Sequence, residues 1–220
     1  MALLSIFEEG VSEMCMFRPG KAEKHENPGA NLRELCNPIV SQAMSDAIKL
    51  ANTFQDVLAK CADSTLEADT HRTLVIAFAG MSWMFAIGRW THIRDTNFRR
   101  TLMAESSWQL ALATATHLCP DGSAADRAFL HTKLLFDEFG PFLQLCEDRA
   151  EELEQVGMSF DNNLITLVVL ESIQERLQIP DSVMNLIVTP EFLAEAGRCA
   201  LAVDRLAIEV MHAEEELMDR

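Results

Sequence analysis

The sequence predicts an all-α protein, a single-domain bundle of five to seven helices with a tethered N-terminal amphipathic helix. Two apolar stripes support this class, because alternating steps of four and three residues place side chains on one face of a helix. The first stripe is Cys36, Val40, Ala43, Ala47, Leu50, Phe54, Val57 and Cys61. The second is Phe192, Ala196, Cys199, Val203, Leu206, Val210, Ala213 and Leu217.

The composition fits one soluble domain with a large core. The chain has 220 residues, and 49% of them are apolar. Its net charge is −16, and residues 137–220 carry 19 acidic but only 5 basic side chains. This charge disfavours direct binding to nucleic acid and favours a cationic protein partner.

The six cysteines predict reduced thiols and a cytoplasmic location. None of them belongs to a C-x-x-C pair, and none has a histidine at zinc-finger spacing. The stripes hold Cys36, Cys61 and Cys199, where a thiol packs as a small apolar group. The N-terminus shows no basic, export-type segment.

Residues 1–17 form the predicted N-terminal amphipathic helix, with Leu4, Phe7 and Val11 as apolar anchors for a partner. Residues 18–31 contain two Pro-Gly pairs and read as a flexible linker, and residues 32–220 form the bundle domain. The N-terminal helix could dock on its own domain or in a groove of another molecule.

The first bundle helix is predicted to start at Asn37, with Pro38 at the first helical position, and to end near Ala62. The second begins near Thr65 and contains Leu74–Gly88, which lacks any charged residue. That stretch is about 22 Å long, shorter than a bilayer core, so we interpret it as the buried central helix rather than a membrane span.

Local capping signals divide the middle of the chain. Asp95 can cap a helix that reaches Leu118, and Ser123 with Asp126 resembles a capping box for the next helix. Gly140-Pro141 predicts a kink or break there. The helix is then expected to resume from Pro141 to about Val156 and end at Gly157.

Three further helical segments complete the predicted bundle. Residues 162–178 are strongly apolar, and Ile179-Pro180 ends that helix. Ser182–Ile187 could form one or two turns. Thr189 as N-cap and Pro190 at the first position begin the last helix.

No catalytic or metal motif is specific enough to predict an enzyme, a metal or a cofactor. Glu209-x-x-His212 resembles half of a di-metal site, but no second pair exists and both side chains fall off the apolar stripe. Asp69 and His71, with Glu67, read as an ordinary acidic first turn. His117 and Cys119 could form a thiolate nucleophile, but they are only two residues apart at a helix end, where alignment is poor. Glu105 and Gln109 are interpreted as a satisfied structural network rather than an acid/base pair.

One basic cluster interrupts the acidic trend, between the second and third predicted helices. Its guanidinium groups and indole suit an anionic partner, although pairing with the acidic C-terminal third would satisfy them equally. The candidate partner-binding residues are Arg89, Trp90, Arg94, Arg99 and Arg100.

These features predict a non-enzymatic, acidic helical protein-interaction module, such as an adaptor, a chaperone-like protein or a regulatory subunit. Its partner is a protein that is cationic or presents a helix groove, and a homo-oligomer is a further possibility. The alternative is a bundle that binds an apolar or anionic small molecule beside Trp83, with Arg89 or Arg94 holding the acid group. A metal-dependent enzyme and a DNA mimic are weaker alternatives.

Overall fold

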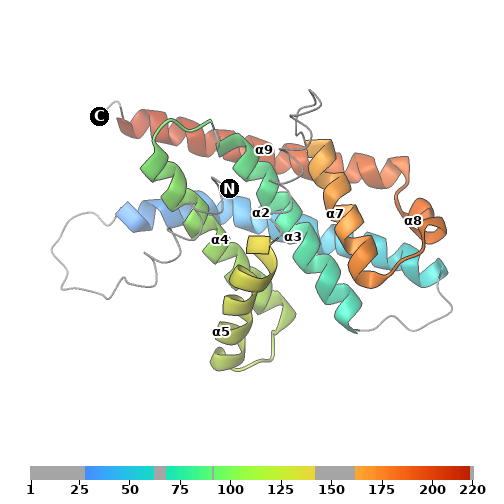
Figure 1. The fold of residues 1–220 in the computed structure, drawn as a ribbon. Coiled ribbons are helices and arrows are strands. Elements are labelled where there is room, and N and C mark those ends of the chain that lie inside the picture. Colours follow the sequence, from blue (N-terminus) through green and yellow to red (C-terminus); the bar gives the residue numbers. More distant parts are fainter. Residues whose placement is uncertain (1–27, 62–67, 91, 142–161, 219–220) are drawn as a thin grey trace.

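The computed structural model describes residues 28–61, 68–90, 92–141 and 162–218 (Figure 1). Within these ranges the chain forms seven α-helices and one π-helical segment, and no β-strand, so the all-α prediction is confirmed. The elements are α2 (Pro28–Cys61), α3 (Ala68–Trp90), α4 (Thr96–Leu118), α5 (Ala124–Lys133), η1 (Leu134–Phe139), α7 (Asn162–Leu177), α8 (Asp181–Ile187) and α9 (Pro190–Met218).

The centre of the bundle is α3, which packs against α2, α4, α7 and α9. Every side chain from Leu74 to Ile87 is buried, as expected for a helix with neighbours on all sides. By length and mean hydropathy α3 could also cross a membrane, but most of its apolar stretch is buried against other helices. A core helix of a soluble bundle has both properties.

Aromatic rings join three of these helices at the core. Phe54 on α2, Phe78 on α3 and Phe192 on α9 lie 6.1 Å apart, centroid to centroid, in each of their three pairs. Trp83 is also buried, and its indole Nε1 donates a 3.0 Å hydrogen bond to Ser106 Oγ on α4. The two predicted stripes supply much of this packing, from Cys36 to Phe54 and from Phe192 to Val210.

The predicted start of the first bundle helix at Asn37 is wrong. Helix α2 begins at Pro28, so residues 28–31 of the expected linker are helical and Pro38 lies inside the helix. Pro38 is exposed, so the carbonyl left without a partner can face water. Leu32 and Leu35 pack against the core before it, which offsets the cost of the proline.

At Gly140-Pro141, where a kink or break is predicted, the helix does not break, and the π-helical segment η1 comes directly before these two residues. The Gly140 N–H donates to the carbonyl of Leu135, five residues earlier, and the chain stays helical through Pro141. A π turn is one way in which a helix accommodates a residue that cannot donate to the regular ladder. The predicted continuation to Val156 and Gly157 lies outside the described residues.

The boundaries predicted near Ala62 and Thr65 lie outside the described residues, whereas the cap residues predicted further along the chain agree with the structure. Asp95 accepts hydrogen bonds from the first turn of α4, and Ser123 with Asp126 forms a complete capping box for α5. Thr189 Oγ1 accepts from the Phe192 N–H at the start of α9. Gln178 adopts a left-handed φ of 51° after α7, and the Ile179 N–H donates to Gln174 O, which closes that helix.

Candidate functional site

The α5–η1 arm (residues 124–139) presents the most exposed large apolar side chain among the described residues. Phe129 is 74% exposed and Phe136 is 52% exposed. Seven residues separate the two rings, which is less than two full turns because Phe136 lies in the wider π-helical segment, so both rings are exposed on the arm within about two turns of each other. Exposed aromatic side chains that lie near one another are typical of a binding surface, whereas isolated exposed apolar residues are ordinary.

The arm is attached to the core of the bundle through η1, whereas α5 has little contact with the core. Helix α5 has no buried residue, and it packs only on α4 and η1 among the stronger helix contacts. Buried Leu134, Leu135 and Phe139 attach η1 to the bundle. Figure 1 shows α5 at the edge of the molecule, on the side away from α9. The core therefore holds η1, while α5 extends beside α4.

A polar and aromatic cluster fixes the α5 side of the arm against α4. His131 lies edge-on to Trp108, with centroids 5.2 Å apart, and its Nε2 is 3.2 Å from the Trp108 carbonyl. The guanidinium of Arg33, from α2, lies 5.4 Å from the Trp108 ring centroid. The His131 contacts therefore hold α5 on α4, and the Arg33 contact holds Trp108 against α2.

Glu105 and Gln109 belong to the same region and form a satisfied structural network. Gln109 Nε2 donates to Glu105 Oε1 at 2.7 Å and to the Arg33 carbonyl at 3.3 Å. Arg33 Nε also lies 3.5 Å from Glu105 Oε1. Each group therefore has a partner within the protein, which agrees with the structural interpretation of this pair.

Several residues of the basic cluster form contacts within the protein itself. Arg89 forms a two-point ion pair with Asp204 of α9, including a 3.1 Å bond from Nη2 to Oδ2. Trp90 is fully buried, so its indole presents no face at the surface. Arg94 is exposed, whereas Arg99 is half-buried and donates to the Ile93 carbonyl at 3.4 Å. Arg100 is half-buried as well.

The other predicted partner-binding residues, Leu4, Phe7 and Val11, lie outside the described residues. Their role as apolar anchors stays a prediction, as does that of the exposed Arg94.

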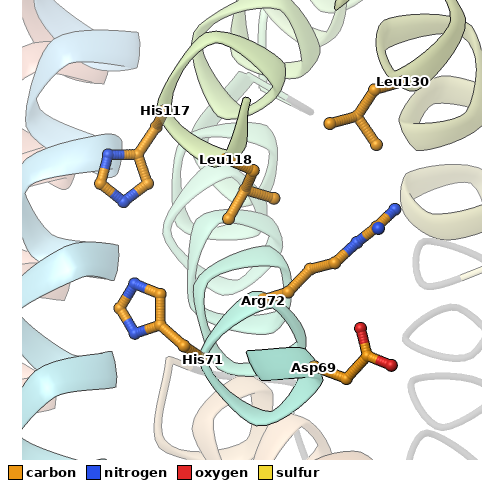
Figure 2. Close-up of a pocket in the computed structure, with 6 residues that line it drawn as sticks. All are labelled: Asp69, His71, Arg72, His117, Leu118 and Leu130. Atoms are coloured by element: carbon orange, nitrogen blue, oxygen red, sulfur yellow. The ribbon is translucent and has the colours of Figure 1, made fainter. Parts of the chain in front are cut away.

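A cavity of about 450 Å³ lies where the start of α3 meets the end of α4 (Figure 2). It is lined by Asp69, His71, Arg72, His117, Leu118 and Leu130. The rings of His71 and His117 are 6.1 Å apart between centroids. Burial lowers the pKa of His117, and the nearby His71 ring lowers it further. The cavity expected for the small-molecule alternative was beside Trp83, whereas this one lies at the other end of α3.

The thiols of Cys36 and Cys199 are poor nucleophiles, because burial raises the pKa of both. Burial raises the pKa of Cys36 to about 12, with a smaller contribution from Glu105. Burial also raises the pKa of Cys199 to about 12, with a contribution from Asp46. Neither thiol is ionised near neutral pH, so both act as core residues. Glu209 and His212, the metal-like pair on α9, are both exposed.

Two features could not be recognised from the sequence. One is the exposure of Phe129 and Phe136 on the arm, and the other is the approach of His71 to His117 in the cavity. The apolar residues from Phe129 to Phe136 nearly surround the helix, so their pattern alone could not show which face α4 covers. His71 and His117 come together only through the packing of α3 on α4. The sequence places each of these residues on a predicted helix, but it does not indicate which residue of another helix lies next to it in space.

Comparisons of the chain with protein-family models, curated proteins and solved structures gave no match. The case for function therefore depends on the residues themselves.

Proposed function

We propose that this protein is a non-enzymatic, acidic helical module that binds another protein through its α5–η1 arm. The single observation that carries the proposal is the exposure of Phe129 and Phe136 on an arm whose outer helix buries none of its residues. Burying a Phe side chain stabilises an association by about 1.5–3 kcal/mol, so two such rings can anchor an interface.

The arm also has the geometry of a preformed binding element. The capping box at Ser123 and Asp126 closes the start of α5, and the His131–Trp108 contact holds the helix on α4. A rigid helix loses less conformational freedom on binding than a flexible segment does. Helical anchors of this kind fit an apolar groove of a partner.

Charge indicates the chemistry of the partner. The whole chain carries a net charge of −16, while the arm itself holds three acidic and two basic side chains, with Asp126, Lys133 and Asp137 exposed. A partner with basic residues around an apolar groove would be attracted at long range and then bury the two rings. The N-terminal anchors Leu4, Phe7 and Val11 would add a second contact in the same kind of assembly.

A pair of matched variants tests this proposal. In the full chain, Phe129→Ser with Phe136→Ser should leave the helical content unchanged but abolish capture of the partner from the native cell. Leu186→Ser on α8 is the control, because Leu186 is 58% exposed but lies outside the arm. Photo-crosslinkers at positions 129, 136 and 186 report the contact directly.

The expected result is crosslinking from positions 129 and 136 but not from position 186. Recovery of a second copy of this chain as the crosslinked product would identify the protein as its own partner. If the double variant captures the same proteins in the same amounts as the unmodified chain, the arm is not the binding surface.

A further inference from the structure

Two histidines from different helices face one another in the cavity between α3 and α4. Figure 2 shows a ring nitrogen of His117 directed toward a ring nitrogen of His71. Their ring centroids are 6.1 Å apart. This separation leaves room between the two nitrogens for one ion bonded to both, because imidazole nitrogens bind Zn²⁺ at about 2.0–2.1 Å.

A hydrogen bond from α2 fixes the tautomer of His71. Its Nδ1 lies 3.0 Å from the side-chain oxygen of Gln55. An amide oxygen only accepts, so this contact places the ring proton on Nδ1 and leaves the lone pair on Nε2. Histidines that bind metals commonly donate their other N–H to an oxygen in this way, which orients the ring and raises its basicity.

No cationic side chain of the cavity lies between the two rings. The charged groups of the cavity are Asp69 and Arg72, and Figure 2 shows both directed away from the two rings. The two imidazoles therefore face each other without an adjacent guanidinium between them.

We propose that His71 and His117 together bind one divalent transition-metal ion of the zinc, copper or nickel class. Imidazole nitrogen suits these ions better than it suits Mg²⁺ or Ca²⁺. The described residues contain no group of three His, Cys, Asp or Glu side chains able to hold a metal, so the protein supplies two ligands in this proposal. The ion ties the first turns of α3 to the last turn of α4, next to the turn from which the arm begins.

Isothermal titration of the full chain with Ni²⁺ tests this site, with His71→Ala, His117→Ala and His92→Ala as variants. His92 is exposed in the α3–α4 connection and serves as the matched control. We expect at least tenfold weaker binding for His71→Ala and for His117→Ala, and unchanged binding for His92→Ala.

Ni²⁺ should also broaden the ring-proton NMR signals of His71 and His117 before those of the other histidines. Circular dichroism without metal checks that each variant is folded, with His117→Gln as the substitute if His117→Ala is not.

Gln55 is a positioning residue in this proposal, because it orients the His71 ring. Variants of Gln55 show whether its hydrogen bond to His71, and not only its packing, is needed for metal binding. Gln55→Leu should weaken Ni²⁺ binding severalfold, Gln55→Glu should restore it by supplying another acceptor, and Asn52→Leu on the exposed face of α2 should change nothing. Equal Ni²⁺ affinity in the unmodified chain, His71→Ala and His117→Ala would overturn the proposal, and so would broadening confined to other histidines.

Discussion

The α3 helix and the α5–η1 arm use apolar side chains in opposite ways. Between Leu74 and Ile87, α3 buries every side chain among four neighbouring helices. Helix α5 buries none, and its Phe129 is 74% exposed. Apolar residues on α3 therefore stabilise the fold, whereas those on the arm add little to stability and remain available for a partner. Substitutions in the two regions should have separable consequences.

The largest effect should come from Trp83 in the core. Trp83→Ala removes a fully buried ring that packs 6.3 Å from Phe139 and donates to Ser106. We expect the free energy of unfolding to fall by about 3–5 kcal/mol, as measured by urea denaturation. Trp83→Phe, which keeps most of the apolar volume, should cost less. A loss below about 1 kcal/mol for Trp83→Ala would show that this end of α3 is not tightly packed.

An intermediate effect is expected at the C-terminal end of α3, where Arg89 meets Asp204. The Asp204 side chain is only 12% exposed, so Arg89→Ala leaves a poorly solvated carboxylate without its cation. We expect a loss of about 1–3 kcal/mol, again measured by urea denaturation. Asp204→Asn in the Arg89→Ala background should recover part of it, because the charge is then gone. No recovery would mean that the ion pair is not the source of the loss.

A smaller effect should appear with pH at the base of the arm. Burial lowers the pKa of His131, and its contact with the Trp108 carbonyl opposes this shift more weakly. The unfolded chain then binds the proton more readily than the folded chain does. This contribution to stability is therefore present above about pH 6.5 and is lost as pH falls through the lower, folded-state pKa.

Thermal unfolding at pH 7.5 and pH 5 measures this contribution. The Tm of the unmodified protein should fall by about 2 °C more than that of His131→Gln over this range. An identical fall in both proteins would show that His131 does not couple the arm to pH.

The smallest effect on stability should come from the exposed rings themselves. Phe129→Ala with Phe136→Ala should change the free energy of unfolding by less than about 0.5 kcal/mol per residue, since little apolar area is buried at either position. Differential scanning calorimetry provides the measurement. A loss comparable to that of Trp83→Ala would mean that the arm belongs to the core and is not a free surface.

Features that depend on neighbours in the sequence could be predicted, and features that depend on packing could not. Asp95, Ser123 and Thr189 were identified as caps because each one bonds to backbone within its own first turn. The start of α2 was misplaced because Pro38 reads as a helix start, while burial of Leu32 and Leu35 extends the helix beyond it.

The candidate sites show the same division. The sequence identified the basic cluster, but the burial of Trp90 and the pairing of Arg89 with Asp204 depend on α9. The exposure of Phe129 depends on which side of α5 contacts α4. The approach of His71 to His117 depends on the packing of α3 against α4. Sequence patterns show which face of each helix is apolar, but they do not show which other helix packs against that face.

Hydrogen–deuterium exchange, measured on the free protein and on its complex with the captured partner, tests the division between core and arm most directly. In the free protein, the amides of Leu74–Ile87 should exchange only through global unfolding, while those of α5 should exchange faster through local opening. On binding, slower exchange should concentrate in residues 124–139, with α3 unchanged. If binding instead slows exchange elsewhere and leaves the arm unaffected, the arm is not where this protein meets its partner.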